Sequence, residues 1–405
     1  MKRIILAAVL LLSVQCFAQI SDSVQLGAGY GSESYYSFNN GEMANVDNSN
    51  WDLAFDLSGF GAAIRFNRRI DVLYLYPGTT ADWATLDTTG ISSWDQYIDG
   101  YDNWSEGALN APADIANPAD LGWGVYNSVT HFTDGNRLFV IELGSGVFKK
   151  LFVEQLASGV YTFKHANLDN SDEVDKTITK SSYSDLNFIY YVLESDQTVN
   201  REPASSGWDI VFTNYVLELG PGYFGGVTSV LHNLGLSTSE VTGVPSASAV
   251  AGTYDDMIST IGYDWKSYDF ATGSYLIEDS NTYFVEIASG EVWKLVFTGF
   301  NGSIDGKIFF TKELVEGTAL REETTLNQVK MYPNPAAERI NFTSDELIKK
   351  IEIHGVNGQL VSSTENINQE ARIEISTQEL NDGFYLVRIL TSENKLNIKK
   401  LIVKH

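Results

Sequence analysis

The sequence contains one β-strand pattern twice, and this repetition constrains the fold more than any other feature. The stretch "NSNWDLAFDLSG" (48–59) has a shorter counterpart in "GWDIVFT" (207–213). In the first stretch every second residue from Trp51 to Leu57 is apolar. Such alternation predicts a strand with one buried and one exposed face.

Two further pairs of segments follow in the same order. "LFVIELGSGVFKKLF" (138–152) matches "TYFVEIASGEVWKLV" (282–296), and "GVYTFKH" (159–165) matches "GKIFFTK" (306–312). Each longer segment predicts a hairpin, because its Ser-Gly pair offers a residue that tolerates the positive φ of a tight turn. A repeated order with inserts of different length indicates a tandem duplication. Short runs of Tyr, Phe, Val, Ile and Thr between Gly, Asn, Asp and Ser predict an all-β protein.

The N-terminus "MKRIILAAVLLLSVQCFAQ" has a charged head and an apolar stretch that ends before Gln19. This pattern predicts a secretory signal peptide over residues 1–18, which is too short for a permanent membrane anchor. We expect no transmembrane segment elsewhere. Cys16 is the only cysteine, so the cleaved chain would depend on apolar cores rather than disulfides.

Charge divides the rest of the chain. The formal net charge is -25, yet the residues from Thr325 onward contain 10 basic and 10 acidic side chains. We therefore predict two β units, 19–175 and 176–324, and a separate domain over 325–405. The acidity argues against nucleic acid as a partner. It also makes an anionic ligand costly unless a local basic pocket exists.

The repeated segments resemble the HmuY-like family of Bacteroidetes outer-surface haem-binding proteins, as two copies over most of residues 27–315. The resemblance implies all-β units and, as cofactor, a haem held between two axial side chains. The candidates for these ligands are His131 and His165 of the first copy, because two imidazoles can ligate a haem iron. In the second copy Lys312 stands at the position of His165.

The tail resembles the type A sorting domain of the type IX secretion system in "VKMYPNPAAERINF" (329–342), "IKKIEIHGVNGQLV" (348–361) and "IEISTQELNDGFYLVRI" (373–389). The residues that match its motifs are Tyr332, Pro333, Asn334, Pro335, Gly355, Asn357, Gly358, Gly383 and Tyr385. Alternating strands and an Asn-Gly hairpin signal predict a small antiparallel β-sandwich. The resemblance implies the type IX secretion machinery as a partner, with export across the outer membrane to the cell surface or the medium.

Other motifs point to structure rather than chemistry. Gly220, Gly222 and Gly225 in "GPGYFGG" fit a dinucleotide-binding pattern, but no βαβ unit surrounds them, so a Gly-rich bend or bulge is predicted. The acidic run "LDNSDEVDK" (168–176) has no calcium-loop spacing and predicts a solvated linker between the copies. No motif fixes a catalytic nucleophile, base or metal, so we expect no enzyme.

These features lead to one functional hypothesis and one alternative. The first is an exported, non-enzymatic surface protein that captures haem or another porphyrin. The alternative is an extracellular structural or carbohydrate-adhesion protein that has kept the fold without an iron site and has a glycan ligand. Trp94, Trp104 and Trp123 of the long insert could form plates for such a ligand, but we predict that they fill cores or pack loops.

Overall fold

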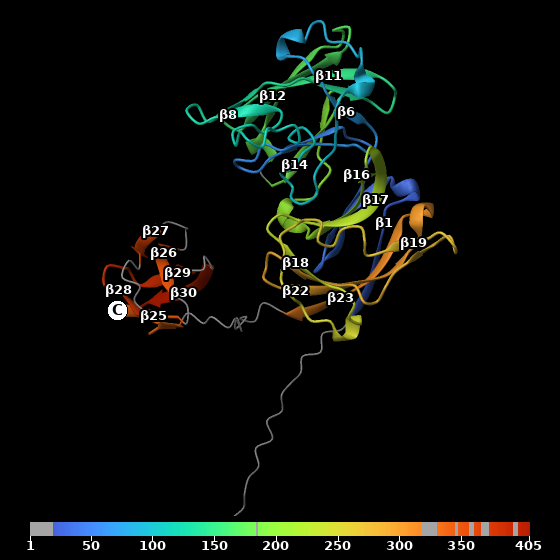
Figure 1. Cartoon of the computed structure of the whole chain (residues 1–405). Helices are drawn as coiled ribbons and strands as arrows, with labels where there is room; N and C mark the ends of the chain where they lie inside the picture. The colour runs from blue at the N-terminus through green and yellow to red at the C-terminus, as the bar shows by residue number, and fades with distance from the viewer. Residues whose placement is uncertain are drawn as a thin grey trace, which may run out of the picture. The chain divides into compact units, whose positions relative to one another are not determined.

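The structure is a computed structural model that describes residues 19–183, 185–316, 330–344, 347–355, 360–365, 372–391 and 396–405. The chain divides into two compact units, residues 1–319 and residues 320–405. The predicted signal peptide, 1–18, lies outside the described residues. Antiparallel sheets make up both units (Figure 1), which confirms the all-β class.

The first β-sandwich, here called sandwich I, packs two sheets face to face. Its outer sheet has the order β13 (Val174–Thr179), β12 (Val160–Asn167), β11 (Phe148–Ala157), β10 (Phe139–Glu142), β6 (Val72–Leu75) and β7 (Gln96–Tyr97). The hairpin of β8 (Gly124–Asn127) and β9 (Phe132–Gly135) joins this sheet through β11. Its inner sheet has the order β15 (Gln197–Val199), β14 (Phe188–Val192), β4 (Leu53–Asp56) and β5 (Ile64–Phe66).

Sandwich II is built in the same way. Its inner sheet has the order β17 (Tyr223–His232), β16 (Ile210–Gly220), β2 (Ser32–Ser37) and β3 (Gly41–Asp47). Its outer sheet has the order β1 (Ile20–Gln25), β23 (Lys307–Glu316), β22 (Val292–Phe300), β21 (Thr282–Glu286) and β18 (Ser237–Val241). A separate ribbon consists of β19 (Ser267–Asp269) and β20 (Ser274–Leu276).

Short 3-10 turns connect some of these strands, and the described residues contain no α-helix. The turns are η1 (Ala28–Tyr30), η2 (Thr80–Asp82), η3 (Ile91–Ser93), η4 (Lys180–Tyr183), η5 (Ser205–Gly207), η6 (Ser246–Ser248) and η7 (Gly302–Ile304). None of the helices in the described part of the chain is long and apolar enough to cross a membrane.

The two predicted hairpins have the same pairing. Glu142 of β10 pairs with Phe148 of β11, and Glu286 of β21 pairs with Val292 of β22. Gly146 and Gly290 adopt φ values of 81° and 82° at the two turns. The shared Ser-Gly pair therefore marks the same turn in both repeats, because a side chain with a Cβ would be strained there.

Each sandwich contains strands from both sequence repeats. Strands β1 to β3 precede the first Trp-Asp strand but pair within sandwich II, and β13 to β15 precede the second one but pair within sandwich I. The predicted boundary between residues 175 and 176 falls inside β13, which pairs with β12. The acidic run predicted as a linker is instead the β12–β13 hairpin turn, where Asn170 and Asp172 adopt positive φ.

The strand at residues 53–56 is buried on both faces, so the prediction of one exposed face was wrong. Leu53 and Phe55 belong to the core of sandwich I, whereas Ala54 packs with Phe188 and Tyr190 on the opposite face. The reason is that the inner sheets of the two sandwiches pack against each other. Figure 1 shows the resulting order of layers from β11 and β12, through β14 and then β16, to β22 and β23.

The repeated Trp-Asp pair holds strands that come from the other repeat. The Asp52 carboxylate accepts a hydrogen bond from the backbone N–H of Leu193 at 2.6 Å, and the Asp209 carboxylate accepts one from Phe38 N–H at 2.7 Å. The neighbouring tryptophans make a matching contact. Trp51 meets Tyr190 edge to face at 5.1 Å, and Trp208 meets Tyr35 at 5.0 Å. We call these paired contacts the Trp-Asp clasps.

The second unit is a small sandwich, as predicted. One sheet has the order β24 (Lys330–Tyr332), β25 (Arg339–Thr343) and β28 (Arg372–Ser376). The other has the order β27 (Leu360–Glu365), β26 (Ile348–Gly355), β29 (Gly383–Thr391) and β30 (Leu396–Val403). Its core contains Phe342, Ile353, Val387 and other buried aliphatic side chains.

We expect Asp209→Ala to lower the free energy of unfolding by about 1–3 kcal/mol, because the N–H of Phe38 loses its acceptor in a region closed to water. Asp209→Asn keeps an acceptor oxygen and should cost less. The exposed Asp87, which accepts a hydrogen bond from Thr89 N–H, gives a control in which Asp87→Ala changes stability little. Urea denaturation of the full chain measures all three variants. Equal losses for Asp209→Ala and Asp87→Ala would contradict the clasp.

Candidate functional site

The two histidines predicted to ligate haem lie far apart. His165 is in β12 opposite Leu151 of β11, whereas His131 precedes Thr133, which lies opposite Leu156. Leu151 and Leu156 are separated by about 16 Å of extended strand. Two imidazoles on one iron have their nitrogens about 4 Å apart, twice a typical metal–imidazole distance. The structure therefore does not bring this pair together as a two-ligand site.

His165 has the surroundings of a core residue. It is buried, and its Nε2 lies 2.9 Å from the hydroxyl of Tyr191. Burial, with a smaller contribution from Lys149, lowers the pKa of His165 to about 4. At the equivalent register of sandwich II, Lys312 lies 4.7 Å from the ring of Tyr36. Both sandwiches thus place a nitrogen-bearing side chain against an equivalent buried tyrosine, Tyr191 in sandwich I and Tyr36 in sandwich II.

His131 occupies the exposed turn between β8 and β9. It adopts a φ of 61°, and its Nδ1 lies 2.7 Å from the hydroxyl of Tyr126. It lines a surface hollow to which His165 does not contribute. The described residues contain no cluster of three or more His, Cys, Asp or Glu side chains that could hold a metal ion.

The other sequence motifs have structural explanations. The Gly-rich segment "GPGYFGG" forms the tip of the β16–β17 hairpin, with a register shift between Glu218 and Gly220 that fits the predicted bulge. Trp123 is fully buried in the core of sandwich I. Trp104 lies between the two inner sheets, and its Nε1 donates to the carbonyl of His232. Trp94 packs against Tyr76. These tryptophans therefore pack cores and loops, as predicted.

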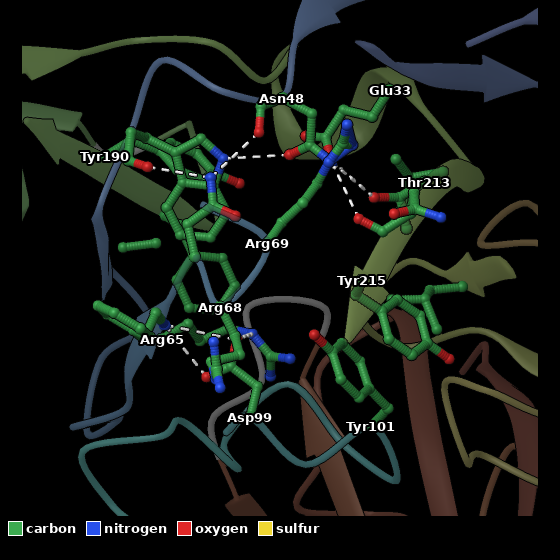
Figure 2. A pocket seen from close by; sticks show the side chains of 18 of the residues that line it. Glu33, Asn48, Arg65, Arg68, Arg69, Asp99, Tyr101, Tyr190, Thr213 and Tyr215 are labelled. Atoms are coloured by element: carbon green, nitrogen blue, oxygen red, sulfur yellow. Dashed lines mark hydrogen bonds and ion pairs between the residues drawn. The ribbon is translucent and has the colours of Figure 1, made fainter. Parts of the chain in front are cut away.

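A cavity of about 70 Å³, lined by charged, polar and apolar side chains, lies between the two inner sheets, and we call it the arginine cavity. Its wall combines residues of β2 and β16 from sandwich II with residues of β4, β5 and β14 from sandwich I. Figure 2 shows Arg65 and Asp99 with the stacked rings of Tyr101 and Tyr215 on one side, and Glu33, Asn48 and Thr213 on the other. Polar and charged side chains such as Glu33, Arg65 and Thr213 interrupt the apolar contacts between the two inner sheets there.

Two buried ion pairs border the cavity. Arg201 lies 2.6 Å from Glu33, which also accepts hydrogen bonds from the hydroxyls of Tyr35 and Thr213. Burial by itself would lower the pKa of Arg201, but the Glu33 carboxylate raises it overall. Since a buried charge without a partner is costly, each of these side chains requires the other.

The second pair joins Arg65 and Asp99 at 3.4 Å. The guanidinium also donates to the carbonyls of Gly100 and Trp104 and lies 5.0 Å from the ring of Tyr101. Burial raises the pKa of Asp99 to about 6, although Arg65 and two backbone N–H groups favour its charged form. Asp99 therefore becomes neutral in mildly acidic solution.

Arg68 and Arg69 add positive charge to the cavity wall without a direct ion pair, although acidic groups near each of them favour the charged form. Arg69 donates to the carbonyls of Tyr30 and Gly29, and Arg68 donates to the carbonyl of Asp71 and the amide of Gln96. Neither guanidinium has a carboxylate within 4.0 Å among the described residues. The Nε atoms of both are buried and have no hydrogen-bond partner. Burial lowers the pKa of both groups, which nevertheless stay charged.

Our sequence analysis missed this cavity, although one signal was present. Residues 19–316 contain five arginines: Arg65, Arg68 and Arg69 line the cavity, Arg201 contacts two lining residues, Glu33 and Tyr190, and Arg137 lies elsewhere. Three of them stand within the five residues "RFNRR" in a strongly acidic chain. Such a concentration of one charge could have indicated a site. The fourth, Arg201, joins them only through the exchange of strands.

In the second unit, several sorting-motif residues lie at one end of the four-stranded sheet, where Gly355 pairs with Tyr385 and Gly383 with Val403. Asn334 lies between two prolines, and its side chain donates to the carbonyl of Lys400 and accepts from the N–H of Ile402, both at 2.8 Å. Tyr385 donates its hydroxyl to the carbonyl of Asn381. Gly355 ends β26 and Gly383 begins β29. Asn357 and Gly358 lie outside the described residues.

The second unit matches a known family. Residues 330–404 match the family model described as a secretion system C-terminal sorting domain. This segment is a type IX sorting domain. The protein is therefore exported across the outer membrane to the cell surface or the extracellular space, and the type IX machinery handles this domain.

The remaining comparisons add little. No curated protein matches the chain. Among solved structures, a crystal structure of dimeric latent PorU from Porphyromonas gingivalis is 12% identical, over 95% of this chain and 34% of that chain, with a TM-score of 0.15. The chain thus spans about a third of that protein. At this TM-score the likeness carries no information about fold or function.

We expect Glu33→Gln to lower the free energy of unfolding by about 3–5 kcal/mol, because it leaves Arg201 buried without a counter-charge. The matched control is Glu154→Gln, which removes an ion pair with Lys164 at 3.5 Å near the surface and should cost less than about 1 kcal/mol. Urea denaturation measures both losses. A loss for Glu33→Gln no larger than the control would show that the pair does not stabilise the junction.

Proposed function

We propose that this exported protein is a non-enzymatic binding protein that holds a small oxyanion in the arginine cavity. Its acidic body repels anions in general, so a local excess of positive charge is needed for such a ligand. The observation that carries the proposal is the concentration of four of the five arginines of residues 19–316 around one cavity.

The charge balance at the cavity supports an anion. Glu33 offsets Arg201 and Asp99 offsets Arg65, whereas Arg68 and Arg69 have carbonyl and amide partners. The buried Nε–H groups of Arg68 and Arg69 lack acceptors, and oxyanion oxygens would provide them. A volume of about 70 Å³ has room for several water molecules or one such group, since one water needs roughly 10–15 Å³.

Sulfate is the sharpest probe for this site, because its charge does not change between pH 5 and pH 7. We expect saturable binding of sulfate in calorimetry at low ionic strength, with affinity at least tenfold weaker in Arg69→Gln. Arg137→Gln is the matched control, because Arg137 pairs with Asp120 away from the cavity. Binding should be tighter at pH 5 than at pH 7, since Asp99 becomes neutral below its pKa of about 6. Asp99→Asn should remove that dependence.

Two outcomes would contradict the proposal. The first is the absence of saturable binding, and the second is an equal loss of affinity in Arg69→Gln and Arg137→Gln. In either case the arginines serve only to join the two sandwiches. Thermal unfolding of each variant without sulfate separates a loss of stability from a loss of binding.

Haem capture through His131 and His165 has no comparable support. His165 lies in β12 opposite Leu151 of β11, whereas His131 lies in the β8–β9 turn, close to Leu156 of β11, and Tyr191 engages the buried His165. We therefore expect hemin added to the full chain to give no bis-imidazole absorption spectrum, and His131→Ala and His165→Ala to leave the spectrum unchanged. A bis-imidazole Soret band lost in both variants would overturn this expectation and restore the haem hypothesis.

A further inference from the structure

A second hollow, of about 310 Å³, opens at one end of sandwich I, and we call it the Phe60 hollow. Three turns surround it: the loop between β4 and β5, the turn between β8 and β9, and the turn between β11 and β12. The predicted haem pair does not account for this hollow, because only His131 of the two histidines lines it. The hollow is also distinct from the arginine cavity, since the two share no lining residue.

Exposed aromatic rings border this hollow. Phe60 is fully exposed, and Tyr126 is 38% exposed, with its hydroxyl 2.7 Å from His131 Nδ1. A single exposed ring is common on protein surfaces, but two aromatic rings at a concave site resemble the lining of ligand pockets. Thr130, Thr133 and Ser158 also line the hollow and carry hydroxyl groups.

The hollow is rigidly built. Lys180 is buried, and its Nζ donates to the carbonyls of Ser58 and Gly61, which fixes the loop that carries Phe60. The backbone N–H of the same lysine donates to the carbonyl of Gly159 at 2.9 Å, which fixes the β11–β12 turn. One residue therefore joins two walls of the hollow, so a ligand would meet a preformed surface.

Two residues of the wall hold backbone conformations that L-residues rarely adopt. His131 has a φ of 61° and Ser158 a φ of 51°. Ser158 and Gly159 are the central residues of a two-residue hairpin turn with positive φ at both, where Asn-Gly or Gly-Gly is usually favoured. Strain of this kind concentrates at ligand-binding surfaces. A serine at this position costs stability and offers a hydroxyl to the hollow.

We propose that the Phe60 hollow binds a neutral pyranose sugar. The apolar C–H face of a pyranose ring packs on an aromatic ring, and its hydroxyls bond to side chains such as Ser158, Thr130 and His131. Among the described residues that line the hollow, Lys180 is the only Lys, Arg, Asp or Glu, and two carbonyls already engage it. A neutral ligand therefore suits the hollow better than an anionic one. Export to the cell surface or medium places it among extracellular glycans.

Sandwich II supplies an internal contrast. There the loop equivalent to the one that carries Phe60 is replaced by the long β16–β17 hairpin, in which β16 extends to Gly220. The proposed sugar site thus belongs to sandwich I alone, and its binding is independent of the oxyanion proposal.

The test is titration of the full chain with methyl glycosides of glucose, galactose, mannose and N-acetylglucosamine, followed by saturation-transfer NMR and calorimetry. We expect saturable binding of at least one glycoside, with affinity at least tenfold weaker in Phe60→Ala. The matched control is Phe270→Ala, which removes a ring of similar exposure in sandwich II and should change nothing. Arg69→Gln should also leave sugar binding unchanged, so the failure of one proposal does not imply the failure of the other.

Ser158→Gly separates binding from stability. Glycine adopts positive φ without strain, so this variant should raise the melting temperature while it weakens sugar binding several-fold. A purely structural serine would give the gain in stability with sugar affinity unchanged. The proposal is overturned if no glycoside binds saturably, or if Phe60→Ala and Ser158→Gly both bind as the parent chain does.

Discussion

The structure depends on the two Trp-Asp clasps, in which each repeat holds a strand of the other. Asp52 and Asp209 accept hydrogen bonds from backbone N–H groups of strands that come from the opposite repeat. Trp51 and Trp208 pack on tyrosines of those same strands. A buried N–H without an acceptor is costly, so neither sandwich is complete without the other repeat. This reciprocity explains why the Trp-Asp pair occurs twice.

The clasps also explain where the arginine cavity forms. Because strands are exchanged, the two inner sheets lie face to face, and the hydroxyls of Tyr35 and Tyr190 approach to 3.4 Å at their junction. Charged side chains that are buried where these faces meet must pair internally. Arg201 and Glu33 do so across the exchange, because one comes from the segment after β15 and the other from β2. Arg68 and Arg69 line the same cavity, and neither forms a direct ion pair with a described carboxylate.

The two proposed sites use different parts of the duplicated fold. The arginine cavity lies at the junction of the two sandwiches, whereas the Phe60 hollow is confined to sandwich I, where the second repeat contributes Lys180. This difference arises because strands and loops diverge to different degrees after a duplication. Strands must keep the pattern that fills the cores, as the paired hairpins do, but the loops can diverge because few core contacts restrain them. The β16–β17 hairpin and the loop at Phe60 show how far such divergence has gone.

The sequence by itself determined the all-β class, the duplicated hairpins and the sorting domain, because these depend on local alternation, turn residues and short motifs. It could not determine which strands share a sandwich. Strand alternation is identical for either partner, so only the tertiary packing decided that β1 to β3 join the second repeat. For the same reason Ala54 was expected to be exposed and is buried. His131 and His165 were chosen as haem ligands by residue type alone. The structure places them at well-separated positions along β11, and composition does not encode such a distance. The arginine cavity required the exchange of strands to bring Arg201 to the "RFNRR" segment.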